Sequence, residues 1–357
     1  MSRRTLLTGA AYHGNRMLSH AEQDMKELVR ADMDVVLHMF SHTDWARHKD
    51  VIRDMISVSE HAGLEVWVDN WGLSGPPGDI SHFLALYPDS HSYWSNGEMF
   101  PTHACLNSPD LRAFIKSWID TVYEIGGRTL FWDEPHIPMK TREDGKILYG
   151  CCCQRCKKLF EDRYNRPMPE YMEANQDADV LAFRNDTIVD YFREITTYSQ
   201  SLGMKNVTCV MFVEAYASDF TLLDRICSLP TMESIGTDPY WYGRGNVNPY
   251  EYVYTRSKQT VEMAEHYKKD HNLWIQTYAV PRGREEEIIQ ATEAAYDAGA
   301  RTILAWGFHG SESNTYRAEN PLRTWEITVE AMKRIRSMER DRILAENRAK
   351  YSQRTPY

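Results

Sequence analysis

Glu134 is the side chain in this sequence that is best suited to donate a proton. It follows the apolar pair Phe131-Trp132 and the carboxylate of Asp133. Apolar surroundings and a neighbouring negative charge both favour the protonated form of a carboxyl group. Pro135 comes next and cannot continue a strand ladder, so Glu134 is expected at a rigid strand end. These features are typical of a general acid.

A carboxylic acid of this kind commonly works with a second carboxylate across the substrate, as in glycoside hydrolysis. Asp238 is our first choice, because it follows the short run Ser234–Gly236 and precedes an aromatic, glycine-containing loop. Glu214 and Glu312 are the reserves. We therefore predict chemistry carried by two carboxyl groups, Glu134 and Asp238.

Further polar and aromatic side chains fall at the ends of apolar runs, where we expect them to bind hydroxyl groups or stack on sugar rings. They are Asp69, Asp133, His136, His13, Trp241, Gln276, Trp306, His309 and Glu312. Any single one could instead cap a helix or satisfy a loop. As a set, titratable groups at most of the expected strand ends predict one polar pocket. Trp67 and Trp274 are expected instead to fill the barrel or the layer between strands and helices.

The cysteines are unevenly spread. Of the seven, four lie between Cys151 and Cys156. Such a dense cluster suits metal binding in a reducing compartment better than a disulfide framework, although plain reduced thiols remain an alternative. Cys209 and Cys227 lie in apolar surroundings and are expected to be inert.

Eight short apolar runs, rich in β-branched and aromatic residues, predict strands. They are Leu6–Ala11, Val35–Phe40, Leu64–Val68, Thr129–Trp132, Val207–Val213, Ser234–Gly236, Leu273–Tyr278 and Thr302–Phe308. Helical patterns lie between them, the clearest beginning at the N-cap pair Ser108-Pro109. Glycines that can end a helix precede the next strand at Gly126, Gly203 and Gly299, which indicates a repeated βα unit.

Eight such units predict a TIM (β/α)8 barrel, a single catalytic domain over residues 1–357. The rival, an open doubly wound sheet, lacks support because no glycine-rich phosphate loop follows the first strand. Long loops are expected after the third strand, from Trp71 to Asn107, and after the fourth, over about 136–178. A charged C-terminal helix is predicted over about 321–350.

Charge and hydropathy exclude several partners. The 41 basic and 51 acidic residues give a formal net charge of −10, and no basic run could follow a phosphate backbone. No stretch is long and apolar enough for a membrane span, and no secretion signal is visible, so a cytoplasmic location is expected. Apolar positions of the tail helix, over residues 322–349, leave a homo-oligomer open.

The segment from His103 to Glu170, about a fifth of the chain, resembles the β-galactosidases of glycoside hydrolase family 42, which belong to a clan of barrel-shaped retaining glycosidases. The likeness consists of Cys105-Leu106-Asn107-Ser108-Pro109, then Trp132-Asp133-Glu134, then Cys151, Cys153 and Cys156 ahead of Phe160 and Tyr164. It implies a structural zinc ion held by Cys105, Cys151, Cys153 and Cys156. Cys152 could replace Cys151 as a ligand.

The same resemblance implies that Glu134 is the acid/base residue, but two positions depart from the family. Asp133 stands where an asparagine is expected, and an aspartate would accept rather than donate a hydrogen bond there. Gln276 stands on the seventh strand, where the clan has its nucleophilic glutamate. A retaining mechanism therefore cannot be carried over to this chain.

The sequence as a whole predicts a glycoside hydrolase acting on a glycoside or oligosaccharide, without an organic cofactor. Three alternatives remain. The weakest, a scaffold protein held together by its C-terminal helix, leaves the strand-end carboxylates unexplained. A metal-dependent sugar isomerase or hydrolase would use ligands such as His13, His42, Asp69, Glu214, Asp238 and His309. A carbohydrate-binding barrel that has lost its chemistry would explain Gln276.

Overall fold

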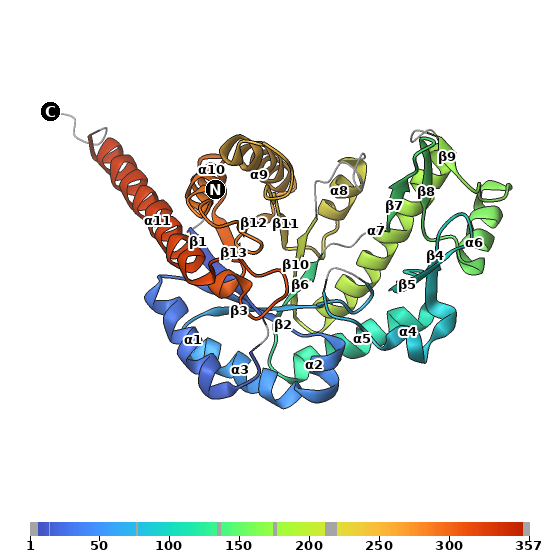
Figure 1. Ribbon diagram of the computed structural model, residues 1–357, viewed down its shortest axis with the longest axis horizontal. Coiled ribbons are helices and arrows are strands. Elements are labelled where there is room, and N and C mark those ends of the chain that lie inside the picture. Colours follow the sequence, from blue (N-terminus) through green and yellow to red (C-terminus); the bar gives the residue numbers. More distant parts are fainter. Residues whose placement is uncertain are drawn as a thin grey trace.

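A closed barrel of eight parallel strands lies at the centre of the protein in its computed structural model (Figure 1). The structure describes residues 6–13, 15–75, 78–133, 137–173, 177–210 and 220–352. The barrel strands are β1 (Leu7–Tyr12), β2 (Val35–Met39), β3 (Glu65–Asp69), β6 (Thr129–Asp133), β10 (Lys205–Cys209), β11 (Ser234–Thr237), β12 (Asp270–Gln276) and β13 (Thr302–Trp306). Their order around the barrel, β1-β13-β12-β11-β10-β6-β3-β2, follows their order in the sequence and confirms the predicted TIM barrel.

All eight predicted apolar runs coincide with these strands, with small differences at the ends. β12 begins at Asp270, before the predicted Leu273, because Asp270 pairs with Ser234 of β11. β10 ends at Cys209, and the last part of that predicted run, 211–213, lies outside the described residues.

The inside of the barrel is filled by apolar side chains. They are Ala11, Val35, Leu37, Met39, Trp67, Phe131, Val207, Cys209, Trp274, Leu304 and Trp306. Successive side chains of a strand point to opposite faces, so the residues between them face the surrounding helices and form the larger core. Trp67 and Trp274 therefore fill the barrel, as expected from the sequence.

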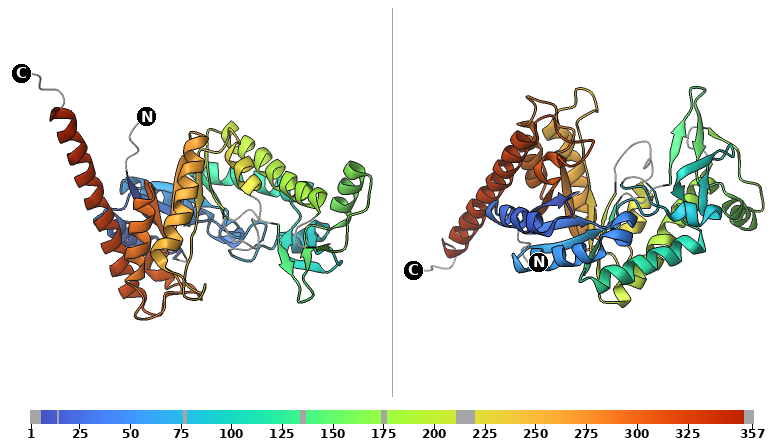
Figure 2. Two further views of the ribbon diagram at one scale, coloured as in Figure 1. Left: turned by 90° about the horizontal axis from the view of Figure 1, so that it is seen from above. Right: turned by 60° about the horizontal axis from the view of Figure 1, so that its bottom comes forward.

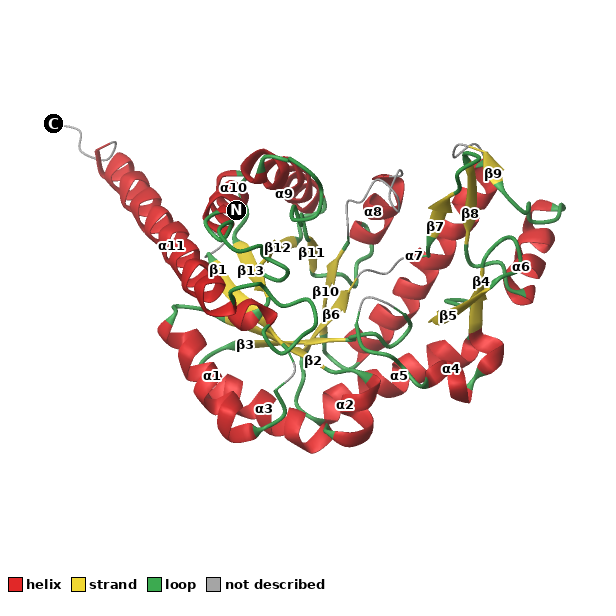
Figure 3. Cartoon of the chain, in the orientation of Figure 1, coloured by secondary structure: helices red, strands yellow, loops and turns green. Residues whose placement is uncertain are grey.

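Helices surround the strands on the outside (Figure 3). They are α1 (Leu18–Arg30), α2 (His42–Arg47), α3 (Lys49–His61), α5 (Pro109–Glu124), α7 (Ala178–Ser201), α8 (Phe220–Cys227), α9 (Pro249–His266), α10 (Glu287–Asp297) and α11 (Pro321–Ser352). The predicted start of α5 is confirmed, since the Ser108 side chain accepts a hydrogen bond from the amide of Leu111 and Pro109 occupies the first turn.

The two long loops fold into small sheets beside the barrel (Figure 2). The loop after β3 carries α4 (Phe83–Leu86), the 3-10 turn η1 (Pro88–Ser90) and the hairpin of β4 (His91–Tyr93) and β5 (Met99–Ala104). The loop after β6 carries β7 (Met139–Thr141), β8 (Lys146–Tyr149), β9 (Met172–Glu173) and α6 (Gln154–Tyr164). A separate apolar cluster joins the two loops, and it includes Cys105, Tyr149 and Phe160.

The C-terminal helix α11 starts on the barrel and ends beyond it (Figure 1). Its first half packs on α10 and on the 3-10 turn η2 (Phe308–Ser311). Arg336 pairs with Asp34 at the start of β2, and Glu339 accepts a hydrogen bond from the Tyr296 hydroxyl at 2.9 Å. In the described part of the chain, no helix is long and apolar enough to cross a membrane.

Candidate active site and metal centre

The strand register directs six of the predicted site residues toward the carboxyl end of the barrel interior. His13, Asp69, Asp133 and Gln276 each lie two residues after an interior side chain, namely Ala11, Trp67, Phe131 and Trp274. Since side chains alternate along a strand, these residues share the inner face. Asp238 follows Gly236, which faces the interior residue Asn272, and Trp306 itself belongs to the interior cluster. We call this end of the barrel, with these six residues, the barrel mouth.

Asp69 is a fully buried carboxyl group in the barrel mouth. It ends β3, is 0% exposed, and neither of its carboxyl oxygens has a hydrogen-bond partner among the described residues. Burial raises the pKa of Asp69 well above its ordinary value, because the charged form loses its hydration. The hydrogen-bonding capacity of this side chain is therefore unused by the described residues.

His13 is half-buried and lies between two tryptophans. Its ring centroid lies 5.5 Å from that of Trp71 and 5.3 Å from that of Trp306. Burial, helped by the positive charge of Arg16, lowers the pKa of His13 to about 4, so the imidazole is neutral at pH 7. Both ring nitrogens are buried without a hydrogen-bond partner in the described residues. The three rings form an aromatic wall of the mouth.

The charges of Asp238 and Asp133 both affect the pKa of one tyrosine, Tyr240. Burial raises the pKa of Tyr240 well above its ordinary value, and the negative charges of Asp238 and Asp133 contribute to the rise. Tyr240 also meets Tyr278, with ring centroids 5.2 Å apart. Asp133 at the end of β6 and Asp238 just after β11 therefore both lie close enough to Tyr240 for their charges to act on it.

Three residues of the mouth were not chosen from the sequence. Trp71 and Tyr278 lie two residues beyond Asp69 and Gln276, so the period-two pattern could have indicated them. Asn70 accepts a hydrogen bond from the backbone amide of Asp133 through Oδ1 at 3.2 Å. The sequence pattern does not predict this contact between the ends of β3 and β6.

Gln276 is already engaged within the protein. Its Oε1 accepts a hydrogen bond from the backbone amide of Tyr242 at 3.0 Å, and the side chain is 2% exposed. The glutamine on the seventh barrel strand therefore holds the loop that follows β11.

Trp241 does not line the mouth, in contrast to the expectation from the sequence. It is 1% exposed within the core between strands and helices, and its Nε1 donates to Glu287 Oε2 at 2.8 Å. The turn after Asp238 directs the indole toward α10 instead of the barrel axis.

His309 and Glu312 also lie elsewhere than expected. The two nitrogens of His309 lie 2.9 Å from Glu27 Oε1 and 3.2 Å from Glu312 Oε1, and Trp325 Nε1 donates to the same Glu27 oxygen at 2.5 Å. These groups join η2 to α1 and α11, because the chain turns through left-handed backbone at His309, with φ 47°. His309 and Glu312 therefore connect elements outside the barrel and do not line the mouth.

Three predicted residues cannot be placed. Glu134 and His136 lie in the segment 134–136, and Glu214 lies in 211–219, both outside the described residues. The described neighbours of Glu134 in sequence, Asp133 and Ile137, border the mouth and the long loop after β6.

The four predicted cysteine ligands converge on one point. The sulfur atoms of Cys105, Cys151, Cys153 and Cys156 all lie within 4.8 Å of one another, and all four residues are buried. Cys105 Sγ lies 3.5 Å from Cys156 Sγ and 3.6 Å from Cys153 Sγ. Tetrahedral thiolates with metal bonds of about 2.3 Å have sulfur spacings of this size, so the cluster fits a metal ion. Hydrogen bonds from the other thiols hold the pKa of Cys153 far below its ordinary value.

Of the two adjacent cysteines, Cys151 lies in the cluster and Cys152 does not. Cys152 is not part of the cluster, since its Sγ donates to the carbonyl oxygen of Tyr149 at 3.6 Å. Asn107 supports the cluster from outside, because its Nδ2 donates to Cys156 Sγ at 3.4 Å and to Thr187 Oγ1 at 3.2 Å.

A buried arginine joins the cysteine cluster to the loop that leaves β6. Arg184 of α7 donates to the carbonyl oxygen of Ile137 at 2.6 Å, to that of Pro138 at 3.3 Å, and to that of Gly150. Ile137 follows the segment of Glu134, and Gly150 precedes Cys151. Burial lowers the pKa of Arg184 to about 10, which leaves the guanidinium charged at neutral pH.

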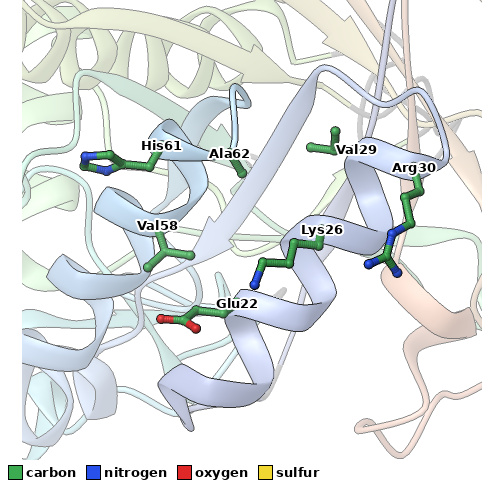
Figure 4. Close-up of a pocket in the computed structure, with 7 residues that line it drawn as sticks. All are labelled: Glu22, Lys26, Val29, Arg30, Val58, His61 and Ala62. Atoms are coloured by element: carbon green, nitrogen blue, oxygen red, sulfur yellow. The ribbon is translucent and has the colours of Figure 1, made fainter.

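A groove on the outer surface, shown in Figure 4, is separate from this site. Its lining comes from α1, with Glu22, Lys26, Val29 and Arg30, and from the end of α3, with Val58, His61 and Ala62. It contains none of the residues that the strand register directs into the barrel mouth.

No protein-family model and no curated protein matches this sequence. Solved structures do match its fold. The catalytic domain of a β-amylase from Paenibacillus polymyxa is 9% identical, with a TM-score of 0.61 over 90% of this chain and 98% of that one. A β-galactosidase from the haloarchaeon Halorubrum lacusprofundi is 12% identical, with a TM-score of 0.69 over 92% of this chain and 58% of the other. An endo-1,4-β-D-mannanase from Thermotoga petrophila is 12% identical, with a TM-score of 0.56 over 92% and 99%. The chain is similar in fold to these TIM-barrel enzymes.

Proposed function

We propose that this protein is a glycoside hydrolase with its active site in the barrel mouth. One observation carries the proposal: the register directs the carboxyl groups of Asp69, Asp133 and Asp238 to the same end of the barrel, next to the aromatic rings of Trp71 and Trp306. Carboxyl groups beside flat apolar rings suit a sugar, whose hydroxyl groups need acceptors and whose ring faces are apolar. The activities of the structures with a similar fold, a β-amylase, a β-galactosidase and a mannanase, support the same class of activity.

Glu134 is the proposed general acid. It would protonate the glycosidic oxygen as the bond to the anomeric carbon breaks, which removes the need to expel an alkoxide. Asp238 is the proposed second carboxylate, acting either as the base for a water molecule or as the nucleophile, with Glu214 in reserve. Gln276 has no part in the chemistry, because an amide cannot serve as nucleophile and its oxygen is bound to the Tyr242 amide.

Substrate binding is assigned to Asp69, Asp133, His13 and Trp306, together with Trp71. The two tryptophan rings lie with centroids 5.6 Å apart and offer the apolar surface. Asp133 can accept hydrogen bonds from hydroxyl groups, whereas the neutral imidazole of His13 can donate one and accept one.

The cysteine cluster is proposed to hold a structural zinc ion. Four thiolates fill the tetrahedral positions of zinc, which leaves no open position for a substrate. The ion would fix the loop after β6 to the loop after β3. Arg184 would hold the residues that follow Glu134 in place through its hydrogen bond to the carbonyl oxygen of Ile137. The chemistry itself stays with the carboxyl groups.

Hydrolysis of a panel of aryl glycosides and oligosaccharides tests the proposal. The wild type should hydrolyse at least one of them in the presence of a chelator that does not unfold it. Glu134→Gln and Asp238→Asn should each lower kcat by at least about 100-fold. Activity that is lost with chelator while the fold persists, and that returns with a divalent metal, would contradict it. Sugar binding without turnover would instead indicate a barrel that only binds carbohydrate.

A further inference from the structure

Asp69 is a carboxyl group placed where a ligand would meet it. It lies at the end of β3, two residues after the interior Trp67 and two before Trp71, whose ring contacts both His13 and Trp306. Both oxygens of Asp69 are buried and have no hydrogen-bond partner among the described residues. Two other buried carboxyl groups differ, since Asp44 pairs with Arg16, and Glu339 pairs with Arg342.

The described surroundings of Asp69 offer no positive charge to balance a carboxylate. Arg16 is the nearby cation on the β1 side, and both of its donor groups that face Asp44 are used there, at 2.6 and 2.7 Å. His13 is neutral at pH 7. Among the described residues, the remaining titratable groups that the register brings to the mouth are carboxylic acids, phenols and a thiol, which carry no positive charge. They are Asp133 on β6, Cys209 on β10, Asp238 and Tyr240 after β11, and Tyr278 after β12.

A carboxylate that is buried without a counter-ion or hydrogen-bond donors is so costly that the group takes up a proton instead. We propose that Asp69 is held as a neutral carboxylic acid and donates a hydrogen bond from its O–H group to a hydroxyl group of the bound sugar. A neutral carboxylic acid that donates in an apolar pocket is an established way to place a strong donor inside an active site. The proposal rests on the proposed function for the identity of the ligand, but the protonation of Asp69 does not depend on it.

This role has a consequence for specificity. An ionised aspartate can only accept hydrogen bonds, so the three aspartates of the mouth would supply acceptors alone if all were ionised. A protonated Asp69 adds one donor and keeps one acceptor, which matches a sugar hydroxyl that both donates and accepts. Removing that hydroxyl from the substrate would leave the buried acid unpaired, and such unpaired groups discriminate strongly against deoxy analogues.

The protonation state is measured first, in the protein without substrate. An infrared difference spectrum between wild type and Asp69→Asn at pH 7 should contain the carbonyl band of a protonated carboxylic acid, present in the wild type alone. The thermal stability of the two proteins should also diverge with pH. A group with a raised pKa in the folded state stabilises the protein below its unfolded pKa and loses that contribution as pH rises. Asp69→Asn should therefore gain on the wild type in Tm as pH increases above about 4. A carboxylate band in place of the acid band, with no such divergence, would overturn the proposal.

The donor role is measured with the sugar that the panel identifies. Asp69→Leu should lower kcat/KM by on the order of 10- to 100-fold. Asp69→Asn keeps a donor and an acceptor of similar shape, so it should recover most of that loss. It should also remove the fall in activity at high pH that ionisation of Asp69 causes in the wild type. If Asp69→Asn is as impaired as Asp69→Leu, the donor role is wrong even where the infrared band is present. If the wild type neither binds nor hydrolyses any sugar, the proposed function fails while the infrared result still decides the state of Asp69.

Discussion

The Oε1 atom of Gln276 accepts a hydrogen bond from the backbone amide of Tyr242 at 3.0 Å. This contact joins the end of β12 to the loop after β11. The loop that begins with Asp238 is thus held by a neutral side chain. In the proposed mechanism the second catalytic carboxylate therefore comes from another strand, as Asp238 or Glu214.

Replacing Gln276 should cost stability. Gln276→Leu leaves the amide of Tyr242 buried without an acceptor, which should lower the free energy of unfolding by about 1–3 kcal/mol. The measurement is chemical denaturation followed by tryptophan fluorescence. The control is Gln200→Leu at an exposed position of α7, where a change within about 0.5 kcal/mol is expected. Equal stability of the two variants would show that the Tyr242 contact contributes nothing.

The cysteine cluster predicts different outcomes for two adjacent substitutions. Cys151→Ser should lose most of the bound metal, because it removes one of four converging sulfur atoms. Cys152→Ser should keep it, since Cys152 Sγ is directed to the Tyr149 carbonyl oxygen instead. Metal content by mass spectrometry should be near one zinc ion per chain for wild type and Cys152→Ser. Equal metal content in both variants would contradict the assigned ligand set.

Arg184 should stabilise the loop after β6, which carries Cys151, Cys153 and Cys156. Arg184→Met leaves the carbonyl oxygens of Ile137, Pro138 and Gly150 without their donor, and each such group costs roughly 1–3 kcal/mol. Arg184→Lys retains a charge and should recover part of the stability. Denaturation and zinc content measure this effect. A stability unchanged within about 0.5 kcal/mol in Arg184→Met would contradict it.

Acid should destabilise the protein partly through His38. This side chain is 0% exposed, its Nε2 lies 2.8 Å from Ser59 Oγ, and burial lowers the pKa of His38 to about 3. The unfolded chain binds the proton near pH 6.5, so the stabilising contribution is complete above that pH and is lost as pH falls toward 3.

His38→Gln removes this titrating group. Its free energy of unfolding should therefore fall less steeply than that of the wild type between pH 6.5 and pH 4, by up to about 1.4 kcal/mol per pH unit. Parallel curves for the two proteins would mean that His38 titrates alike in both states.

The barrel could be predicted from the sequence because each strand is a short apolar run with glycine-terminated helices between. The cysteine cluster could be predicted because its spacing is unusual. Side-chain direction could be predicted along a strand and for up to two residues past its end, as at Trp71 and Tyr278. Asp69 and Gln276 are the last residues of β3 and β12 and lie in the mouth, whereas Trp241 and His309 lie beyond strand ends. There the backbone turn, which tertiary packing sets, decides the direction, and both residues face the helix layer.

The role of Glu134 as proton donor is tested most directly by the hydrolysis of two aryl glycosides of one sugar. One has an acidic phenol as its leaving group, and the other has a weakly acidic phenol. The variant is Glu134→Ala, compared with the wild type. A general acid matters most for the poor leaving group, so kcat/KM should fall by about 100-fold or more for the weakly acidic phenol and far less for the acidic one. An equal loss for both substrates, or no loss for either, would contradict the role of Glu134 as the proton donor.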